Sequence, residues 1–460
     1  MRTVINNGRV IDPVNGVDGN LNMAFENGRI SDRSIEPLQG DLVIDASGLT
    51  VTPGFVDIHI HEDAYLPVQD QFQGSLFESL LRMGVTTAVG GNCGIGSDRP
   101  DVYLDAVDRI GLPVNTGLLV PHATLRKQVG LENPCQQATT GQIRVMASIA
   151  DEWLSDGCLG VSFGIRYTPG INREELTAIS CEIRKHRAFL AVHLREDAGG
   201  VIEAVEEVTR ATSETGVPLQ ISHVGSMAGF GQMEEFLKLL ELKRSAGRDI
   251  SADCYPYDSF STYIGAETFG EGFLERYQTG YASIEIAQGQ HQGQRCTKEL
   301  FEHLRSREPA LLTIAHVMKP EEIEKAIAHP WVMVASDGLI NGQQGHPRAA
   351  GTFPRVLGEY VRHRGLLPLP EAVAKMTAVP AKRLGVSKGK LGMGDDADIT
   401  LFDPAIIMDQ ATFQSPLMPP VGIEGVFVNG RMALWKNQIM DTHAGRSLRN
   451  QRSTKQLWKG

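Results

Sequence analysis

The sequence lacks the features that mark membrane, secreted and nucleic-acid-binding proteins. No segment approaches the ~20 consecutive apolar residues of a membrane helix, and the N-terminal residues have no signal-peptide pattern. Lys and Arg number 44 against 55 Asp and Glu, which gives a formal net charge of -11. Partners with anionic surfaces need clustered positive charge. We therefore expect no nucleic-acid partner, no membrane partner and a cytoplasmic location.

Cysteine is scarce and scattered. Six cysteines are spread over 460 residues and form no CxxC pair, so the sequence predicts no disulfide framework and fits a reducing compartment. A chain of this length can bury a large core without such cross-links, as one barrel-type domain or as two to three ordinary domains.

The pattern of apolar residues changes near residue 53. Before that point short strands alternate with turns such as Asn7-Gly8 and Asn27-Gly28, which predicts a small β unit. From Gly54 onward buried strands alternate with amphipathic helices, as in a parallel sheet with crossover helices. The predicted strands are 55–60, 86–90, 114–119, 159–165, 189–194, 219–223, 250–255 and 332–336. Eight such units favour a closed (β/α)8 barrel of the TIM type over an open sheet.

The remaining segments complete the predicted architecture. Helices are expected at 142–153, 174–185, 203–213 and 233–242. A stretch of about fifty residues before the last strand is interpreted as a lid or insertion, with a helix near 297–305. Residues 311–316 are predicted to form a further strand. We predict an α/β fold with three parts. They are a barrel over 53–384 with insertion 258–310, a small β-sandwich domain formed by 1–52 and 385–440, and a tail over 441–460.

Two histidines follow the first predicted barrel strand. His59 and His61 are two residues apart, so their side chains share one face at roughly 6–7 Å. The carboxyl ends of barrel strands carry the active sites of this fold. A His-x-His pair alone is weak evidence for a metal, but these two point toward the same region of the barrel mouth.

Three more potential ligands follow other strands. Cys93 comes after the second strand, flanked by glycines, while His193 and His223 end the fifth and sixth strands. Each residue alone is more often a core residue. Together, one thiolate and two imidazoles leave a fourth zinc position open for water. Asp337 ends the last strand and can act there as general base and then general acid, or simply cap a following helix.

At these residues the sequence resembles the amidohydrolase superfamily, and within it the D-aminoacylase (N-acyl-D-amino-acid deacylase) branch. The resemblance runs from 53–61 to 389–399, and Asn92-Cys93-Gly94 is its most specific element. The carboxylated lysine of many dinuclear members has no counterpart, because no lysine lies between Lys127 and Lys185. The resemblance implies one tightly bound zinc at Cys93, His193 and His223, and a second, weaker divalent-metal site lined by His59 and His61. It also implies that Asp337 is the acid/base.

The resemblance also implies substrate contacts. Arg348, Tyr255 and Ser261 match positions that bind a substrate carboxylate, and Tyr167 matches one that polarises the scissile carbonyl. The alternatives are a surface salt bridge for Arg348, a solvated hydroxyl for Ser261 and core packing for the tyrosines. One departure is Gly225, where the family has a lysine; Arg195 or a lid residue is a candidate substitute. His316 is interpreted as structural.

The resulting hypothesis is a zinc-dependent hydrolase of the amide in an N-acyl-D-amino acid or a similar carboxylate-bearing small molecule. Two alternatives stay open on the same fold: a cyclic amide or imide hydrolase or deaminase, and a non-catalytic barrel scaffold. The sequence leaves open the acyl group, the side chain, the chirality of the substrate, the number of metals and whether the chain forms a homo-oligomer.

Overall fold

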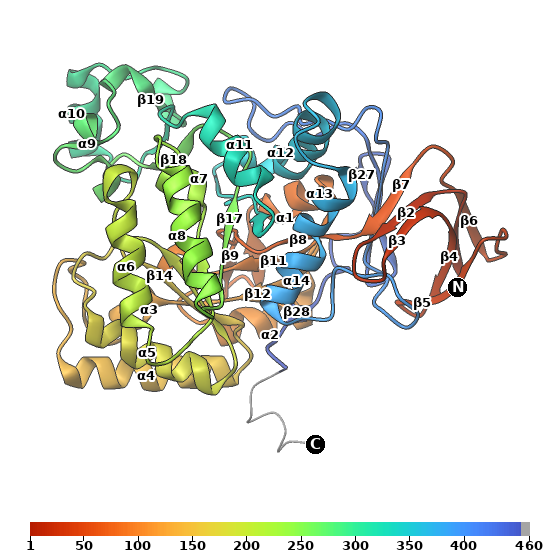
Figure 1. Cartoon of the computed structure of the whole chain (residues 1–460), viewed down its shortest axis with the longest axis horizontal. Coiled ribbons are helices and arrows are strands. Elements are labelled where there is room, and N and C mark those ends of the chain that lie inside the picture. Colours follow the sequence, from red (N-terminus) through yellow and green to blue (C-terminus); the bar gives the residue numbers. More distant parts are fainter. Residues whose placement is uncertain (452–460) are drawn as a thin grey trace.

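The computed structural model describes residues 1–451, and its centre is a set of parallel strands surrounded by helices (Figure 1). These strands are β8 (Phe55–Asp57), β11 (Val85–Gly90), β12 (Asn115–Leu118), β13 (Val120–Pro121), β14 (Gly160–Gly164), β15 (Phe189–His193), β16 (Leu219–Ile221), β17 (Ile250–Cys254) and β21 (Val332–Val334). All eight predicted strands are confirmed in position, with β12 and β13 forming the third.

The parallel strands pair with their neighbours in chain order, and a bridge joins the segment after the last strand to the segment after the first. One run joins β8, β11 and β12, and a second joins β13, β14, β15, β16, β17 and β21. Leu119, between β12 and β13, donates its N–H to Gly90 O (2.9 Å). An isolated parallel bridge joins Ile60, beyond β8, to Gly338, beyond β21. The carboxyl ends of all these strands therefore meet at one edge.

Helices connect the strands and bury one face against them. They are α1 (Leu76–Arg82), α2 (Pro100–Ile110), α3 (His122–Gln128), α4 (Thr140–Ser155), α5 (Arg173–Lys185), α6 (Val201–Ala211), α7 (Val224–Ala228), α8 (Met233–Ser245), α11 (Pro320–Ala328), α12 (Arg348–Arg355), α13 (Leu369–Met376) and α14 (Ala378–Leu384). The four predicted helices are confirmed as α4, α5, α6 and α8. On α6, Val201, Ala204, Val205 and Val208 are buried at three-to-four spacing. Among residues 1–451 no helix is both long and apolar enough to cross a lipid bilayer.

Strands from both ends of the chain form two further sheets beside the parallel strands (Figure 1). Their strands are β1 (Thr3–Asn6), β2 (Arg9–Asp12), β3 (Val17–Asn20), β4 (Asn22–Glu26), β5 (Arg29–Ser34), β6 (Leu42–Asp45), β7 (Thr50–Pro53), β24 (Ile399–Phe402), β25 (Ile423–Val428), β26 (Arg431–Trp435) and β27 (Gln438–Ile439). Strand β24 pairs antiparallel with β7, so the C-terminal segment rejoins the N-terminal unit as the sequence predicts. The shared core includes Ile5, Phe25, Val51, Leu401 and Phe427.

The segment between β17 and β21 forms a small sheet of its own. Strands β18 (Phe260–Tyr263) and β19 (Ile284–Ile286) pair antiparallel with β20 (Leu312–Ala315), and α9 (Phe273–Arg276) and α10 (Lys298–Arg307) flank them. The predicted helix and strand of this segment are confirmed as α10 and β20. Asp197, after β15, anchors it: its carboxylate accepts the Tyr277 hydroxyl (2.5 Å) and pairs with Arg276 (3.1 Å).

Part of the predicted tail is ordered against the parallel strands. Strand β28 (Ser447–Leu448) pairs in parallel with β12, and the Arg449 guanidinium pairs with Asp105 (2.7 Å) and Asp108 (3.1 Å) of α2. The rest of the predicted tail, residues 452–460, lies outside the described residues.

A buried lysine secures the start of β21, the strand that leads to Asp337. The Lys375 ammonium, on α13, donates to the carbonyls of Ile327 (2.9 Å), Val332 (3.0 Å) and His329, at the C-terminal end of α11 and the start of β21. Burial lowers its pKa to about 8. The three hydrogen bonds offset this loss of hydration, and a cation suits a helix C-terminus.

We expect Lys375→Met to lower the free energy of unfolding by about 2–4 kcal/mol, because three buried carbonyls lose their donor. Urea denaturation checks this, with the exposed Lys382→Met as the matched control. Equal midpoints for the two variants would contradict the anchoring role.

Candidate metal centre

Six side chains that could act as metal ligands or as an acid/base come together where the parallel strands end. His59 and His61 follow β8, and Cys93 lies in the short helix η1 (Asn92–Gly94) after β11. His193 is the last residue of β15, and His223 and Asp337 follow β16 and β21. The structure thus brings together all five predicted metal ligands and the predicted acid/base.

The first group is Cys93, His193 and His223. One ligand atom of each lies within 4.8 Å of the others, and all three side chains are buried. Cys93 Sγ is 3.3 Å from His223 Nε2. Burial raises the pKa of the Cys93 thiol, but the His223 and His59 imidazoles more than offset this, so the pKa lies well below its usual value. A thiolate with two imidazoles is a donor set that suits zinc.

The second group shares the same sulfur. His59, His61, Cys93 and Asp337 also present ligand atoms within 4.8 Å of one another. Asp337 Oδ1 lies 3.1 Å from His61 Nε2 and 3.3 Å from His59 Nε2. Burial alone would raise the pKa of Asp337, but the Arg348 guanidinium and the neighbouring imidazoles hold it well below its usual range. The carboxylate is therefore ionised and can take up a proton.

The backbone at this centre is unusual in three places. Cys93 (φ 53°), His223 (φ 33°) and Asp337 (φ 49°) adopt left-handed conformations, which are uncommon for residues other than glycine and cluster at functional sites. Glycine is needed beside Cys93: a Cβ on Gly94 would come 2.7 Å from Gly164 N, and a Cβ on Gly164 would come 2.0 Å from Cys93 O. The close approach of η1 to β14 therefore places the thiol.

The predicted substrate-binding arginine lies against the predicted acid/base. Arg348 is only 2% exposed, so the surface alternative is wrong. Its Nη2 is 2.9 Å from Asp337 Oδ2, and its Cζ lies 4.7 Å from the centre of the Tyr255 ring. Arg348 Nε and Nη1 are buried and have no hydrogen-bond partner in the protein. Two donors are therefore free for a ligand.

The other predicted contact residues divide into two kinds. Ser261, on β18, lines the cavity beside the ligand cluster and donates its hydroxyl to Thr313 O (2.9 Å). Tyr167 also lines it, with its ring 4.7 Å from that of His193. Tyr255 is not among the described residues that line the cavity. It lies behind Arg348, whose guanidinium covers its ring.

Three alternatives raised by the sequence are settled by the geometry. Asp337 is followed by the short strand β22 (Ile340–Asn341), not by a helix that it could cap. The Arg195 side chain is held by Glu207 and by the carbonyls of Pro169 and Ile171, so the suggestion that it replaces the missing lysine is wrong. His316 pairs with Glu285 (3.2 Å), as expected for a structural residue.

Two supporting residues were missed in the sequence. Asp253 accepts the backbone N–H of His223 (2.8 Å) and an N–H of Gln220 (2.7 Å), and Ser226 Oγ lies 2.9 Å from His223 Nδ1. Both restrain the orientation of His223. An acidic residue inside the apolar run 250–254 was a signal that could have identified Asp253, whereas Ser226 had none.

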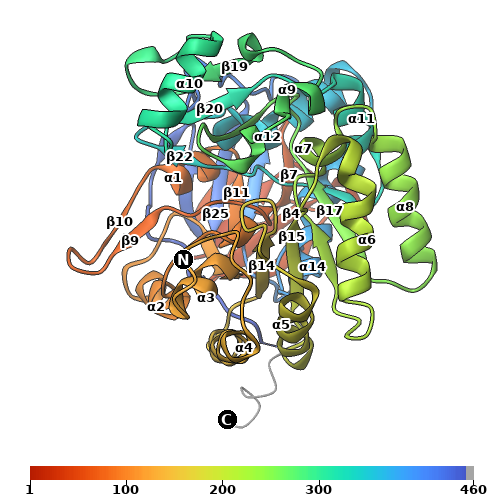
Figure 2. The same ribbon diagram turned by 90° about the vertical axis from the view of Figure 1, so that its left-hand side faces the viewer.

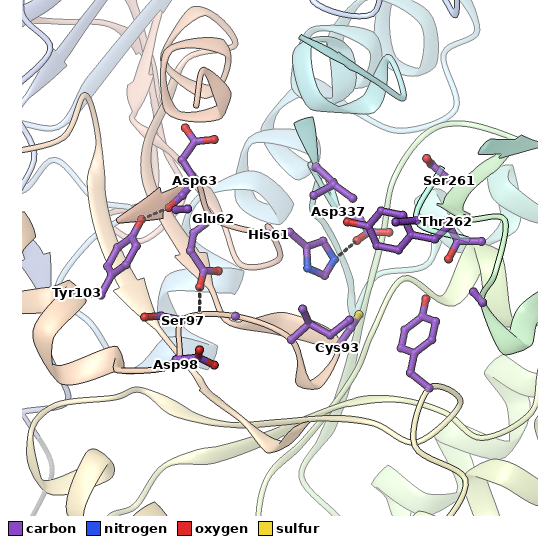
Figure 3. A pocket seen from close by; sticks show the side chains of 18 of the residues that line it. His61, Glu62, Asp63, Cys93, Ser97, Asp98, Tyr103, Ser261, Thr262 and Asp337 are labelled. Atoms are coloured by element: carbon purple, nitrogen blue, oxygen red, sulfur yellow. Dashed lines mark hydrogen bonds and ion pairs between the residues drawn. The ribbon is translucent and has the colours of Figure 1, made fainter. Parts of the chain in front are cut away.

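The cluster opens into a cavity of about 1010 Å³. Figure 3 shows His61, Cys93 and Asp337 at its middle, with Ser261 and Thr262 on one side and Glu62, Asp63, Ser97, Asp98 and Tyr103 on the other. The cavity is at the upper end of the 300–1,000 Å³ range of small-molecule sites.

Known proteins resemble this chain over most of its length. The amidohydrolase family matches residues 42–249 and 299–433. The chain is 33% identical to a D-aminoacylase of Alcaligenes xylosoxydans xylosoxydans over 88% of each chain, and 31% identical to an N-acyl-D-glutamate deacylase of the same organism over 98% of this chain and 97% of the other. It also superimposes on the N-acyl-D-glutamate deacylase of Bordetella bronchiseptica, solved with zinc and a phosphonate inhibitor. The TM-score is 0.87 at 29% identity, over 97% of this chain and 99% of the other.

Removal of the shared sulfur should weaken metal binding. We expect Cys93→Ala to retain less than about a tenth of the zinc held by the unaltered chain after dialysis against a weak chelator, because the soft anionic donor common to both groups is lost. Elemental analysis by mass spectrometry measures this. Cys158→Ala, another buried cysteine whose thiol pKa is raised by burial, is the matched control. Zinc retained equally by both variants would disprove ligation by Cys93.

Proposed function

Because the chain belongs to the amidohydrolase family, with relatives of the D-aminoacylase branch, we propose that it hydrolyses the amide bond of N-acyl-D-amino acids, releasing a carboxylic acid and a D-amino acid. The observation that carries this proposal is the pairing of a zinc-type donor set with Arg348, which lines the ligand cavity and has two nitrogens without a hydrogen-bond partner in the protein. The protein is a metal-dependent hydrolase of non-peptide C–N bonds.

We propose that Cys93, His193 and His223 hold one zinc ion tightly, and that His59 and His61 line a second, weaker divalent-metal site that shares Cys93 and Asp337. When bound, zinc lowers the pKa of water toward ~7 and polarises the scissile carbonyl. The low pKa of the Cys93 thiol favours this set, because the ligand form is already deprotonated.

Asp337 is proposed to move the proton. Its Oδ2 is held by Arg348, while Oδ1 lies among the imidazoles of His59 and His61, and Oδ1 is the oxygen proposed to accept the proton of the attacking water. The same oxygen then returns the proton to the leaving nitrogen, which departs as an amine. Arg348 keeps the carboxylate ionised at the start of each cycle.

Arg348 is also proposed to bind the substrate carboxylate. Its Nη2 remains on Asp337, and its Nε and Nη1 are free to donate. Ser261, across the cavity wall, and the Tyr255 ring beneath the guanidinium complete this side. Tyr167, against His193, is proposed to donate its hydroxyl to the carbonyl oxygen. Gly225 has no side chain and therefore supplies no cation on this side. A Cβ at this position would lie 2.9 Å from Ile323 Cδ1 and 3.2 Å from Cys254 Sγ.

The proposed architecture follows from the strand pairing. We propose that residues 53–384 form a (β/α)8 barrel whose pairing closes through Ile60 and Gly338. Residues 258–310 are an insertion beside the mouth, and residues 1–52 and 385–440 form a small β-sandwich. Active sites of this fold lie at the carboxyl ends of the strands, which is where the candidate ligands lie.

Replacement of the acid/base tests the mechanism directly. We expect Asp337→Asn to lower kcat by about 10²–10⁴-fold, because an amide cannot accept the proton of water. Initial rates on a panel of N-acyl-D- and N-acyl-L-amino acids, together with hydantoins and dihydroorotate, give this value and the substrate class. Activity confined to the cyclic amides would refute the proposed function, and full activity of Asp337→Asn would refute the proton role.

Replacement of Arg348 tests the carboxylate contact. We expect Arg348→Ala to lower kcat/KM for the best N-acyl-D-amino acid by about 10–100-fold more than for its carboxamide analogue, because only the carboxylate uses a charge-assisted hydrogen bond. The comparison of two substrates removes the effect of Arg348 on Asp337. Arg99→Gln, at another arginine that lines the cavity, is the control. An equal loss on both substrates would refute the contact.

A further inference from the structure

The side of the cavity that faces away from the insertion has an apolar wall. Beyond the ligand cluster lie Tyr65, Pro67, Ile95, Val102 and Tyr103, which we call the hairpin arm. Tyr65 belongs to the hairpin of β9 (Ala64–Leu66) and β10 (Gln71–Gln73), which projects from the body in Figure 2. Phe72, on the second strand, packs between Tyr65 (5.3 Å between ring centres) and Tyr103 (5.0 Å). The hairpin and the start of α2 thus form one continuous surface.

The charged residues beside the hairpin arm are already paired within the protein. The Glu62 carboxylate accepts the N–H groups of Gly91 (2.6 Å) and Ser97 (2.9 Å), and that of Asp63 accepts the N–H of Leu76 (3.0 Å) at the start of α1. Figure 3 shows the contact between Glu62 and Ser97 on this side.

The two charged residues at the outer edge are paired as well. Asp98 binds Lys127 (2.7 Å), and Arg99 binds Asp101 through two hydrogen bonds. A charged ligand group would therefore compete with these partners, whereas an apolar group would not.

The tyrosine hydroxyls also point to protein partners. Tyr65 Oη donates to Asp70 (2.8 Å), and Tyr103 Oη donates to Asp63 O (3.0 Å). Both rings therefore offer carbon atoms to the cavity, and their polar ends are occupied. The arm is an apolar surface joined directly to the catalytic cluster.

Resting on the proposed function, we propose that the hairpin arm binds an extended apolar acyl chain, so that the preferred substrates are N-acyl-D-amino acids with medium or long acyl groups. The carboxylate and the amino-acid side chain share the nitrogen side of the scissile bond, with Arg348 and Ser261. The acyl group extends from the carbonyl on the opposite side of the cluster, where Figure 3 shows Ser97, Asp98 and Tyr103. An acetyl group would leave this surface uncovered, in a cavity of about 1010 Å³.

The test compares N-acetyl and N-octanoyl derivatives of the same D-amino acid with the zinc-loaded full chain. Each buried methylene strengthens binding by up to roughly fourfold, so we expect kcat/KM at least tenfold higher for the octanoyl substrate. A ratio near or below one, with hydrolysis observed, overturns this inference and leaves the proposed function intact. No hydrolysis of either compound or of any other N-acyl-amino acid overturns both.

A variant locates the effect in the arm. Val102 is the third residue of α2, where an acidic side chain is compatible with the helix N-terminus. We expect Val102→Glu to lower the octanoyl-to-acetyl ratio of kcat/KM at least fivefold, because a charge then lies beside the chain. Val145→Glu, at a half-exposed valine of α4, is the matched control and should leave the ratio unchanged. An unchanged ratio in Val102→Glu would place the acyl chain elsewhere.

Discussion

The site depends on one deprotonated thiol held out of water among imidazoles. A buried anion is costly unless opposite charge or hydrogen bonds compensate it, and Cys93 has His223 at 3.3 Å and His59 at 3.4 Å. The sulfur belongs to both groups of candidate ligands, so its position determines the distance between them. The second anion, Asp337, is compensated by Arg348 in the same way. The two anions are supplied by different strand ends, after β11 and after β21, so the arrangement depends on the pairing that brings these ends together.

The backbone makes this convergence possible at some energetic cost. Left-handed conformations at Cys93, His223 and Asp337 cost of order 1–3 kcal/mol each for non-glycine residues. Hydrogen bonds from neighbouring strands offset that strain. Asp253 accepts the N–H of His223, and the N–H of Asp337 is donated to His59 O (2.9 Å). The strand ends thus hold one another in the conformation that aims the side chains inward.

The sequence predicted the strand ends well because the pattern that marks each of them lies within a few consecutive residues. An apolar run followed by His59, His193 or Asp337 identifies both a strand and the polar residue at its carboxyl end. The parallel arrangement then brings such residues together. The three-stranded sheet between 260 and 315 was not predicted, since β18 and β19 pair with β20 across long stretches of chain. The engagement of Arg195 by Glu207 and the placement of Tyr255 behind Arg348 likewise depend on tertiary packing that no spacing reveals.

The two walls of the cavity come from parts of the chain that are anchored independently. Ser261 lies on the segment between β17 and β21, which is fixed to the loop after β15 through Asp197, Arg276 and Tyr277. Tyr65 and Tyr103 lie on the β9–β10 hairpin and α2, which Phe72 joins by ring packing. Neither set of anchors involves a candidate metal ligand. A change in the hairpin can therefore alter the group that is recognised on one side of the scissile bond while the candidate metal ligands, Asp337 and the opposite wall keep their geometry.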